Sequence, residues 1–462
     1  MALYWWVVGA LLGALLVGAG ATPNAGQRPP MGWNSWESYE GAISAQLFTK
    51  TASAMVKLGL PALGYNRFNT DSGWEDYTFP NNGSKRPCAG RGADGLLSTD
   101  PAKFPQGLHP VAAHVHSLGL KWGMYLPFHA CPATGPTKFD HTAADIQLCT
   151  ELNATFVKVD ALGFSSSPAD TQQQMRAFAQ TIRGSSIPSM FLSNCHMGCM
   201  SSNDKRRGGW APWCSEVSDM WRTSRDMEPN WPSVMWNLGT MVGRGSDAGP
   251  GIGWNNPDIL EVGVIRKGMT PLTVVEAQSH FALWCVTSSP LLLSMELAGG
   301  NSGTPTWHKM IDIVKNPHAI WVNQQFVQAP LGPLPIAGDR LQNISATTEI
   351  WAKPVPVPPG HTGKTAFAAV LFNRGQQPAR ITLDFGLLGV SFVGSGAAIF
   401  DVIAGKDIAG KAKGEYSSRT IESHGCEFVV VVFPDPLATP EPRIPSKRRV
   451  PGVLVRDGAG SI

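Results

Sequence analysis

The sequence predicts a chain in two parts, an α/β domain built on a parallel sheet and an all-β domain after it. From about residue 30 to about residue 320, short apolar runs typical of strands alternate with longer segments that have apolar residues at helical spacing. Strands that alternate with helices indicate βαβ units. After about residue 325, short strand-like runs are separated by Gly, Pro and Asn, with no helical period between them. This second pattern is typical of a small antiparallel sandwich.

The composition is that of a large folded protein with little net charge. Of the 462 residues, 43% are hydrophobic and 15% are charged, and the net charge is +3. Such a chain can bury a large core, which excludes global disorder, and it lacks the strong positive field typical of nucleic-acid binding. The 50 Gly and 37 Pro follow no collagen-like period and therefore indicate many turns. The chain also has 16 Trp but only 6 Tyr, an unusual ratio.

An apolar run at the amino terminus has the layout of a secretory signal peptide. The run from Leu3 to Val17 is followed by small residues up to Ala21, and Pro23 comes soon after. We therefore expect a signal peptide over residues 1–21 and a protein that is secreted or reaches an endomembrane, vacuolar or lysosomal compartment. The alternative is an uncleaved membrane anchor, although the run is short for a span. No later segment is apolar over about eighteen residues, so no other span is expected.

Eight cysteines and three glycosylation sequons fit the secretory route. An even number of cysteines permits disulfide bonds in a secreted chain, but their spacing does not give the connectivity. Cys195 and Cys199 lie beside His196, yet no second pair stands at zinc-ligand spacing, so no metal site is predicted. The sequons begin at Asn82, Asn153 and Asn343.

The first domain has six candidate strands with helical candidates between them. The strand candidates are Tyr65–Asp71, Leu120–Leu126, Thr155–Asp160, Ser189–Asn194, Met220–Asp226 and Pro290–Met295. The helical candidates are Ser44–Leu58, Pro110–Leu118, Thr142–Leu152 and Ala169–Ile182. Four of the strand candidates end in a polar residue, namely Asp71, Asp160, Asn194 and Asp226. In a parallel barrel these ends share one rim, but an open doubly wound sheet gives a similar pattern, so the alternation alone does not choose.

The second domain has five candidate strands and is followed by a tail. The strand-like runs are Leu341–Ala352, Ala366–Phe372, Arg380–Phe385, Ala397–Val402 and Cys426–Phe433. Beyond Pro434 the chain is rich in Pro, Arg and Gly and contains the basic cluster Lys447–Arg449, so a solvated tail is expected over residues 436–462.

Two carboxylates at strand ends are the candidates for chemistry. Lys158 precedes Asp160 by two residues, so both side chains share one face of their strand, and the ammonium can hold the carboxylate ionised. Asp226 ends a later strand, and two carboxylates on one rim could act as nucleophile and acid/base on a glycosidic bond. The alternative is that these aspartates cap helices or hold loops. Tryptophans that could stack on a sugar lie near the same ends, at positions Trp33, Trp36, Trp74, Trp221 and Trp254.

Several motifs in order make the chain similar to the α-galactosidases of glycoside hydrolase family 27. The segment Met31-Gly-Trp-Asn-Ser-Trp-Glu37 resembles the opening of that family. The later matching motifs are Tyr65–Trp74, Phe156–Asp160, Trp221–Asp226, Gly253–Gly263, Glu276–Trp284 and the run Ser289-Pro-Leu-Leu-Leu. The resemblance covers about Arg28 to Pro434. It implies a (β/α)8 TIM barrel over residues 28–322 and a C-terminal antiparallel β-sandwich over 323–435. For the first domain, the resemblance thus favours a closed barrel over an open doubly wound sheet.

The resemblance also implies a retaining mechanism without metal or organic cofactor. By position, Asp160 matches the nucleophile and Asp226 the general acid/base, whose pKa should be raised in the free enzyme. The carboxyl groups of such a pair lie roughly 5–5.5 Å apart. The positions that match the sugar-binding pocket are Trp33, Asp71, Ser72, Lys158, His196, Arg222 and Asp258.

The chain departs from the family pattern at sugar-reading positions. Ser72 stands where the family commonly has a second Asp, and His196 stands where a Glu lies near the sugar 2-position. The family usually has a Cys within two residues of the nucleophile, and this Cys forms a disulfide. Here Asp160 is followed by Ala161, Leu162 and Gly163, so that disulfide cannot form in the usual way. Cys131 would then pair with Cys149 or Cys88, or stay free, and the resemblance implies a Cys195–Cys214 disulfide.

We therefore predict a retaining glycoside hydrolase that releases terminal α-D-galactosyl residues from oligosaccharides or glycoconjugates. Its partner is a carbohydrate substrate, and neither nucleic acid nor a membrane is expected as a partner after signal cleavage. One alternative keeps the chemistry and changes the sugar, giving an α-N-acetylgalactosaminidase or a β-L-arabinopyranosidase. The other alternative is a carbohydrate-binding protein that has lost catalysis, against which the retained Asp160 and Asp226 argue.

Overall fold

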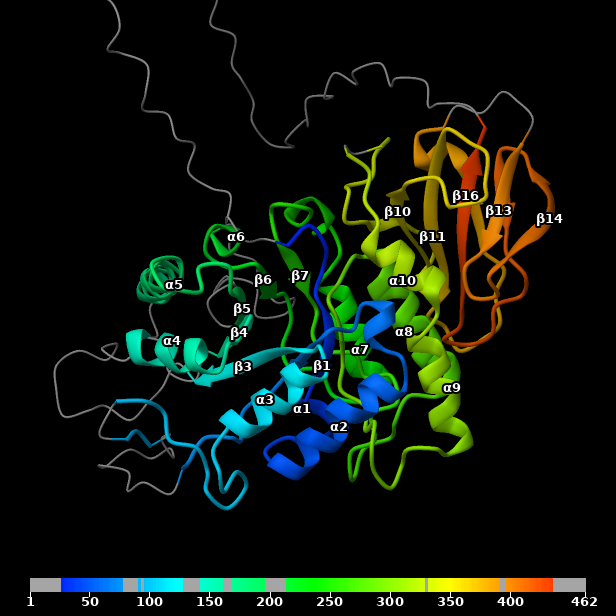
Figure 1. The fold of residues 1–462 in the computed structure, drawn as a ribbon. Coiled ribbons are helices and arrows are strands. Elements are labelled where there is room, and N and C mark those ends of the chain that lie inside the picture. Colours follow the sequence, from blue (N-terminus) through cyan, green and yellow to red (C-terminus); the bar gives the residue numbers. More distant parts are fainter. Residues whose placement is uncertain are drawn as a thin grey trace, which may run out of the picture.

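The computed structural model describes residues 26–77, 90–92, 95–127, 142–160, 168–195, 213–328, 331–390 and 396–434. These residues form a barrel and a sandwich that lie side by side (Figure 1). The predicted signal peptide and the predicted tail lie outside the described residues. Within the described part of the chain, no helix is long and apolar enough to cross a membrane.

Eight parallel strands make the barrel. They are β1 (Met31–Asn34), β2 (Arg67–Asn69), β3 (Lys121–Pro127), β4 (Phe156–Asp160), β5 (Phe191–Cys195), β6 (Met220–Arg222), β7 (Trp254–Asn256) and β8 (Leu291–Leu293). Their order is β7-β6-β5-β4-β3-β2-β1-β8. A parallel bridge joins Leu260, just after β7, to Leu293 of β8, and the Leu260 N–H donates to the Leu292 carbonyl at 2.8 Å. This contact closes the sheet, so the TIM-barrel prediction is confirmed.

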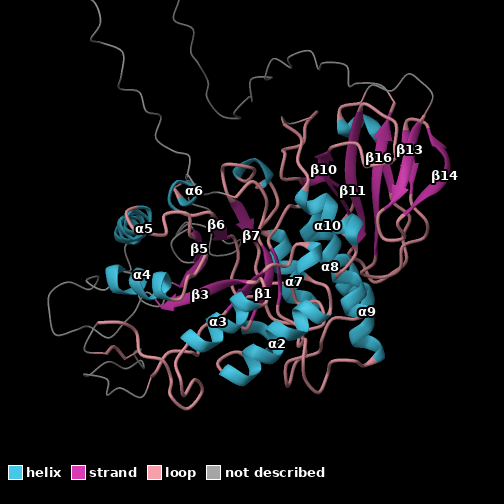
Figure 2. Cartoon of the chain, viewed as in Figure 1, coloured by secondary structure: helices cyan, strands magenta, loops and turns pink. Residues whose placement is uncertain are grey.

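Helices surround these strands (Figure 2). They are α1 (Trp36–Tyr39), α2 (Ala45–Lys57), α3 (His109–Ser117), α4 (Thr142–Glu151), α5 (Pro168–Arg183), α6 (Cys214–Val217), α7 (Trp231–Gly239), α8 (Val274–Val286), α9 (Pro305–Val314) and α10 (Pro317–Gln324). Local sequence explains where several begin. The Ser44 hydroxyl accepts from the Leu47 N–H at the start of α2, and Thr273 and Glu276 form a capping box at the start of α8.

The second unit is the predicted antiparallel sandwich. Its strands are β9 (Asp339–Asn343), β10 (Thr348–Val355), β11 (Thr365–Asn373), β12 (Thr382–Asp384), β13 (Ala397–Asp401), β14 (Lys406–Ala412), β15 (Glu415–Ser417) and β16 (Cys426–Phe433). Six strands form a sheet in the order β14-β13-β16-β11-β10-β9, and β12 pairs with β15. A separate apolar core that includes Leu383, Phe367 and Val431 lies between these sheets. The single predicted run Leu341–Ala352 is two strands, β9 and β10, joined by a turn.

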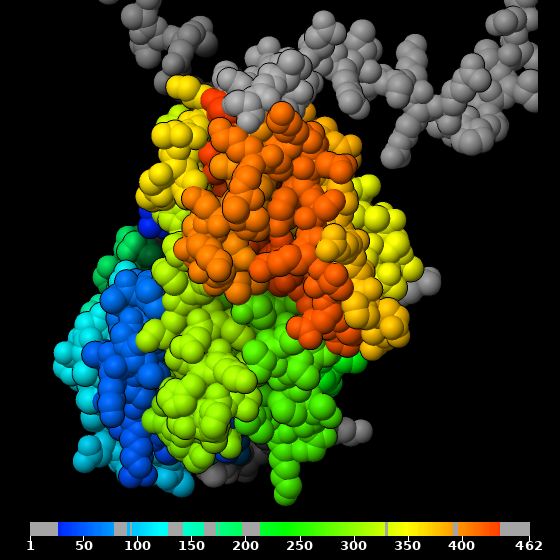
Figure 3. All heavy atoms as spheres, turned by 90° about the vertical axis from the view of Figure 1, so that its right-hand side faces the viewer, coloured from blue at the N-terminus to red at the C-terminus, as the bar shows by residue number. Residues whose placement is uncertain are grey.

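The sandwich packs directly on the barrel domain (Figure 3). Helix α8 contacts the sandwich strands β10, β11 and β16, and α10 contacts β10 through Lys353. The buried ammonium of Lys353 in β10 donates to the Val322 carbonyl at 2.7 Å, near the carboxyl end of α10. On the other side of the joint, the Trp231 ring stacks on His424 at 5.0 Å between centroids, and His424 Nδ1 lies 2.8 Å from Glu276 Oε1. Polar and aromatic contacts thus fix the two units against each other.

The predicted Cys195–Cys214 disulfide is wrong. Cys195 is a free thiol, as are Cys149, Cys285 and Cys426, whereas Cys214 is disulfide-bonded. Alternation along β6 explains the error, because Arg222 contacts Cys195 inside the barrel while Trp221, on the opposite face, packs on Cys214. Cys149 is buried and free, so it is not the partner of Cys131. Cys88, Cys131 and Cys199 lie outside the described residues.

Candidate active site

Asp71 follows β2, and its carboxylate accepts three hydrogen bonds. Its Oδ2 accepts from Lys158 Nζ at 2.8 Å and from Asn34 Nδ2 at 2.9 Å. Its Oδ1 accepts from the Ser72 N–H, and its own N–H donates to Ser35 Oγ, both at 2.9 Å. The residue is 1% exposed, so these donors replace the water that a buried carboxylate loses. Asp71 is therefore a fixed anion at the rim, with its ammonium partner beside it.

Lys158 and Asp160 share the inner face of β4, as the spacing predicts. Val157 and Val159, which alternate with them, are fully buried on the other face. Burial would lower the pKa of Lys158, but the charges of Asp71 and Asp160 outweigh it and hold the pKa well above its usual value. The site thus contains a permanent cation next to the candidate nucleophile.

Arg222 at the end of β6 joins two carboxylates. Its Nη1 lies 3.1 Å from Asp226 Oδ1, and its Nη2 lies 2.7 Å from Asp258 Oδ2. Burial would lower the pKa of the guanidinium, but Asp258 and Asp226 together hold it above the usual value. The Asp226 side chain is 72% exposed, so the candidate acid/base is anchored on one side and open to solvent on the other. A leaving group and a water molecule can both reach such a carboxyl.

Asp258 fixes the backbone that carries Asp226. Its Oδ2 accepts from the Met227 N–H at 2.8 Å, and its Oδ1 accepts from the Ile259 N–H at 2.9 Å. The residue has φ +94°, a conformation that non-glycine residues rarely adopt and that recurs at functional sites. Burial raises the pKa of Asp258, and the Arg222 charge opposes that rise. Asp258 is thus a buried anion between the guanidinium and the loop after β6.

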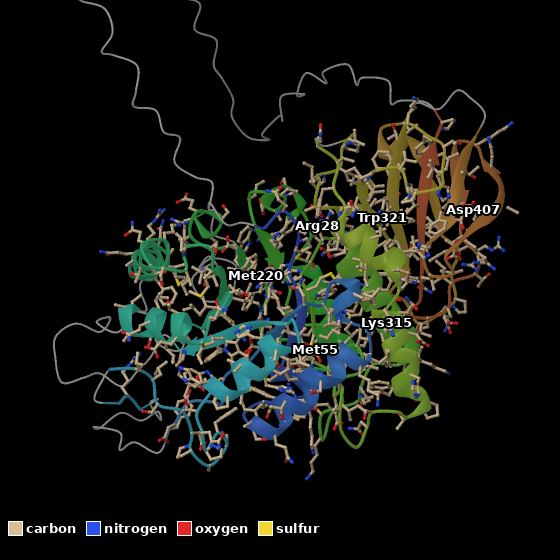
Figure 4. All side chains as sticks on the ribbon, viewed as in Figure 1. Arg28, Met55, Met220, Lys315, Trp321 and Asp407 are labelled. Atoms are coloured by element: carbon tan, nitrogen blue, oxygen red, sulfur yellow. The ribbon has the colours of Figure 1, made fainter. Side chains whose placement is uncertain are left out.

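Among the described residues, the structure brings most of the predicted site residues together and leaves out Trp33. Figure 4 labels Met220, the first residue of β6, and Arg222 is the last residue of the same strand. Trp33 is fully buried on the outer side of β1, where its ring stacks on Phe68 at 4.9 Å, so its assignment to the sugar pocket is not supported. Successive side chains of a strand point to opposite faces. Asn34 points inward and donates to Asp71, so the preceding residue Trp33 points outward. His196 lies outside the described residues.

Glu75 and Tyr77, which lie near Asp71, carry no signal in the sequence pattern. Ser72 is partly buried, and its hydroxyl is hydrogen-bonded to the Tyr77 phenol, which also contacts Glu75. The Glu75 Oε2 accepts from the Gly73 N–H at 2.7 Å, and burial raises the pKa of this carboxyl to about 7. Both residues lie in an irregular segment after β2, where neither period two nor a helical period marks a face.

Comparison with known proteins decides the family. The family model described as alpha galactosidase A matches residues 28–325, more than half of the chain. The chain belongs to the alpha galactosidase A family. The match covers β1 to β8, so it includes every residue of the site described above.

Relatives from this family match along most of their length. The alpha-galactosidase of Cyamopsis tetragonoloba is 29% identical over 411 residues, which cover 88% of this chain and 86% of that protein. The alpha-N-acetylgalactosaminidase of Homo sapiens is 29% identical over 404 residues, which cover 83% of this chain and 87% of that protein. The solved structure of alpha-galactosidase I from Mortierella vinacea gives a TM-score of 0.70 at 22% identity, covering 88% of this chain and 97% of that one, and shows the same fold. The predicted family and fold are both confirmed.

Proposed function

We propose that the protein is a retaining α-galactosidase that releases terminal α-D-galactosyl residues from oligosaccharides or glycoconjugates. The observation that carries the proposal is that a fixed cation lies near each candidate carboxylate. Lys158 shares a strand face with Asp160, and Arg222 lies 3.1 Å from Asp226. Relatives of this family are named for hydrolysis of α-galactosides, which agrees with this arrangement.

In the first step, a carboxylate oxygen of Asp160 attacks the anomeric carbon of the sugar. The glycosidic C–O bond breaks as Asp226 gives its proton to the leaving oxygen, and an ester links the sugar to Asp160. In the second step, Asp226 takes a proton from water, the water oxygen bonds to the anomeric carbon, and the ester bond breaks. Two inversions at one carbon give net retention. The carboxyl groups of such a pair lie roughly 5–5.5 Å apart.

The cations set the charge of the pocket during these steps. Positive charge develops on the sugar ring in the transition state, and the ionised Asp160 stabilises it. Lys158 can donate to a sugar hydroxyl, while Asp71 can accept from one. Arg222 orients Asp226, and the exposed side of that carboxyl exchanges protons with solvent.

The departures from the family pattern at the sugar-binding positions leave two alternative sugars for the substrate. Ser72 removes one carboxylate acceptor from the pocket, and a relative in the same family is an alpha-N-acetylgalactosaminidase. Loss of a buried hydrogen-bond partner changes discrimination between sugars by orders of magnitude. A β-L-arabinopyranosidase is the second alternative. The assembled cluster of Asp71, Lys158, Arg222 and Asp258 argues against a protein that only binds carbohydrate.

We also propose that the protein passes through the secretory pathway and is glycosylated. The apolar run before Ala21 supports a signal peptide. Asn153 and Asn343 begin sequons and are exposed at the surface, so both are accessible to a glycosyltransferase.

A panel of 4-nitrophenyl glycosides tests the proposed activity. We expect release of nitrophenol from the α-D-galactoside, faster than from the α-N-acetylgalactosaminide and the β-L-arabinopyranoside. Asp160→Ala should retain less than about a thousandth of kcat/KM. If the wild-type protein releases nitrophenol from none of the panel while galactose still raises its melting temperature, the binding-protein alternative is correct.

A further inference from the structure

Two buried carboxyl groups lie behind Asp258 and take no part in the proposed catalytic steps. Glu37 belongs to α1, directly after β1, and is 1% exposed. Glu261 follows β7 in the chain, three residues beyond Asp258, and is fully buried. Their carboxyl groups lie close enough for each to perturb the other. A contact between two carboxyl groups needs a proton between them, because two carboxylates have no donor.

Arg266 donates to Glu37, and Ser294 accepts from its backbone. Its Oε2 lies 2.6 Å from Arg266 Nη2, and the same guanidinium donates twice more to the Glu37 carbonyl, at 3.0 and 3.1 Å. The Glu37 N–H donates to Ser294 Oγ at 2.9 Å, just after β8. Arg266 therefore neutralises one negative charge at this place, and that charge belongs to the Glu37 side of the pair.

Glu261 has no such donor. Both of its side-chain oxygens are buried, and no N–H or O–H group of the described residues donates to either of them. Its backbone N–H donates to His280 Nε2 at 3.1 Å, so that ring nitrogen is an acceptor. Burial lowers the pKa of His280 to about 3, so the ring is neutral and supplies no positive charge. An ionised Glu261 would be an uncompensated buried charge, whereas the protonated acid can donate to Glu37.

We propose that Glu37 and Glu261 share one proton and that this acid–carboxylate pair is a positioning device for the catalytic acid/base. The pair ties α1 to the segment that carries Asp258. Asp258 in turn binds the Met227 N–H and Arg222, which hold Asp226. The positioning role rests on the proposed glycosidase function, whereas the shared proton does not.

Loss of that proton should loosen this region at alkaline pH. The charged groups that face Glu37 are Asp258, Arg266, Lys158 and Glu261, and those that face Glu261 are Glu37, Asp258 and Arg266. Two carboxylates would then lie beside Asp258 with Arg266 as the adjacent cation. Burial and the Asp258 charge raise the pKa of Glu37 to about 8 from 4.5, and burial and Glu37 raise that of Glu261 well above its usual value.

The first test follows the proton through stability. The native pair keeps a proton that the unfolded chain loses near pH 4.5, so the wild-type free energy of unfolding should fall as pH rises above that value, until the native pair also loses the proton at alkaline pH. Glu261→Gln replaces the acid O–H with an amide N–H that does not ionise, so the part of the fall that this pair contributes should disappear. Glu40→Gln, an exposed neighbour 3.5 Å from Arg266 Nε, is the control and should keep the wild-type slope. A Glu261→Gln curve parallel to wild type would overturn the shared proton.

The second test follows position through kinetics on the α-galactoside. Glu261→Gln should keep kcat near the wild-type value at neutral pH, because the amide still donates to Glu37. Glu261→Leu fills a similar volume without a donor and should lower kcat about tenfold, the effect of one buried hydrogen bond to a charged group. KM should change little in both variants. Wild-type kcat in a folded Glu261→Leu would overturn the positioning role. If the wild type hydrolyses no glycoside, the proposed function fails and the stability test still decides the proton.

Discussion

Removal of the Lys158 ammonium should destabilise the fold and disable the site together. Lys158 Nζ lies 2.8 Å from Asp71 Oδ2, and the two side chains are 14% and 2% exposed. Truncation of one partner of a buried ion pair costs about 3–5 kcal/mol, because the other charge stays buried without compensation. In this variant, Asp71 keeps its hydrogen bonds from Asn34 and the Ser72 N–H. We therefore expect Lys158→Met to lower the free energy of unfolding by about 3 kcal/mol, the low end of this range.

Urea unfolding followed by near-ultraviolet circular dichroism measures this loss. The double variant Lys158→Met with Asp71→Asn removes both charges and should recover most of the lost stability, although not the activity. Lys158→Met should also lower kcat/KM, since the ammonium that pairs with Asp71 and can donate to a sugar hydroxyl is gone. A loss below about 1 kcal/mol, or a double variant no more stable than the single one, would refute the reasoning.

Three further predictions test separate parts of the site. Asp226→Ala should lower kcat/KM far more for a galactoside with a poor leaving group than for one with a good leaving group. A good leaving group departs without protonation, so it does not need the acid; equal losses of kcat/KM would contradict the acid role. Glu75 has a pKa raised by burial from 4.5 to about 7, so wild-type stability should fall as pH rises between these values. Glu75→Gln should remove that part of the fall, and an unchanged slope in urea unfolding would contradict it. Trp33→Ala should cost about 3–5 kcal/mol of stability as a core truncation and leave KM unchanged; a raised KM would return Trp33 to the pocket.

The strands that sequence analysis predicts are those with long apolar runs. Phe156–Asp160 reads as a strand because buried valines alternate with Lys158 and Asp160, and the structure has β4 at the same place. The strands β1 and β7 have four and three residues and contain Asn and Trp, so no apolar run marks them. Their existence follows from closure of the barrel, which is a property of the whole sheet.

The site itself could be predicted only where a strand period fixes the direction of a side chain. Lys158 and Asp160 follow from period two along β4, and the same rule applied to β1 separates Trp33 from Asn34. No such rule covers Glu261 or Tyr77, because both lie in irregular segments between elements. Their neighbours come from other strands, so the contacts appear only after the chain has closed.

The stereochemistry of the first product tests the central proposal most directly. Proton NMR can follow hydrolysis of 4-nitrophenyl α-D-galactoside by the wild-type enzyme before the released sugar mutarotates. Double displacement through Asp160 predicts that α-D-galactose appears first and that the β-anomer grows only later. Initial release of β-D-galactose would show direct displacement by water and contradict the assignment of Asp160 as nucleophile.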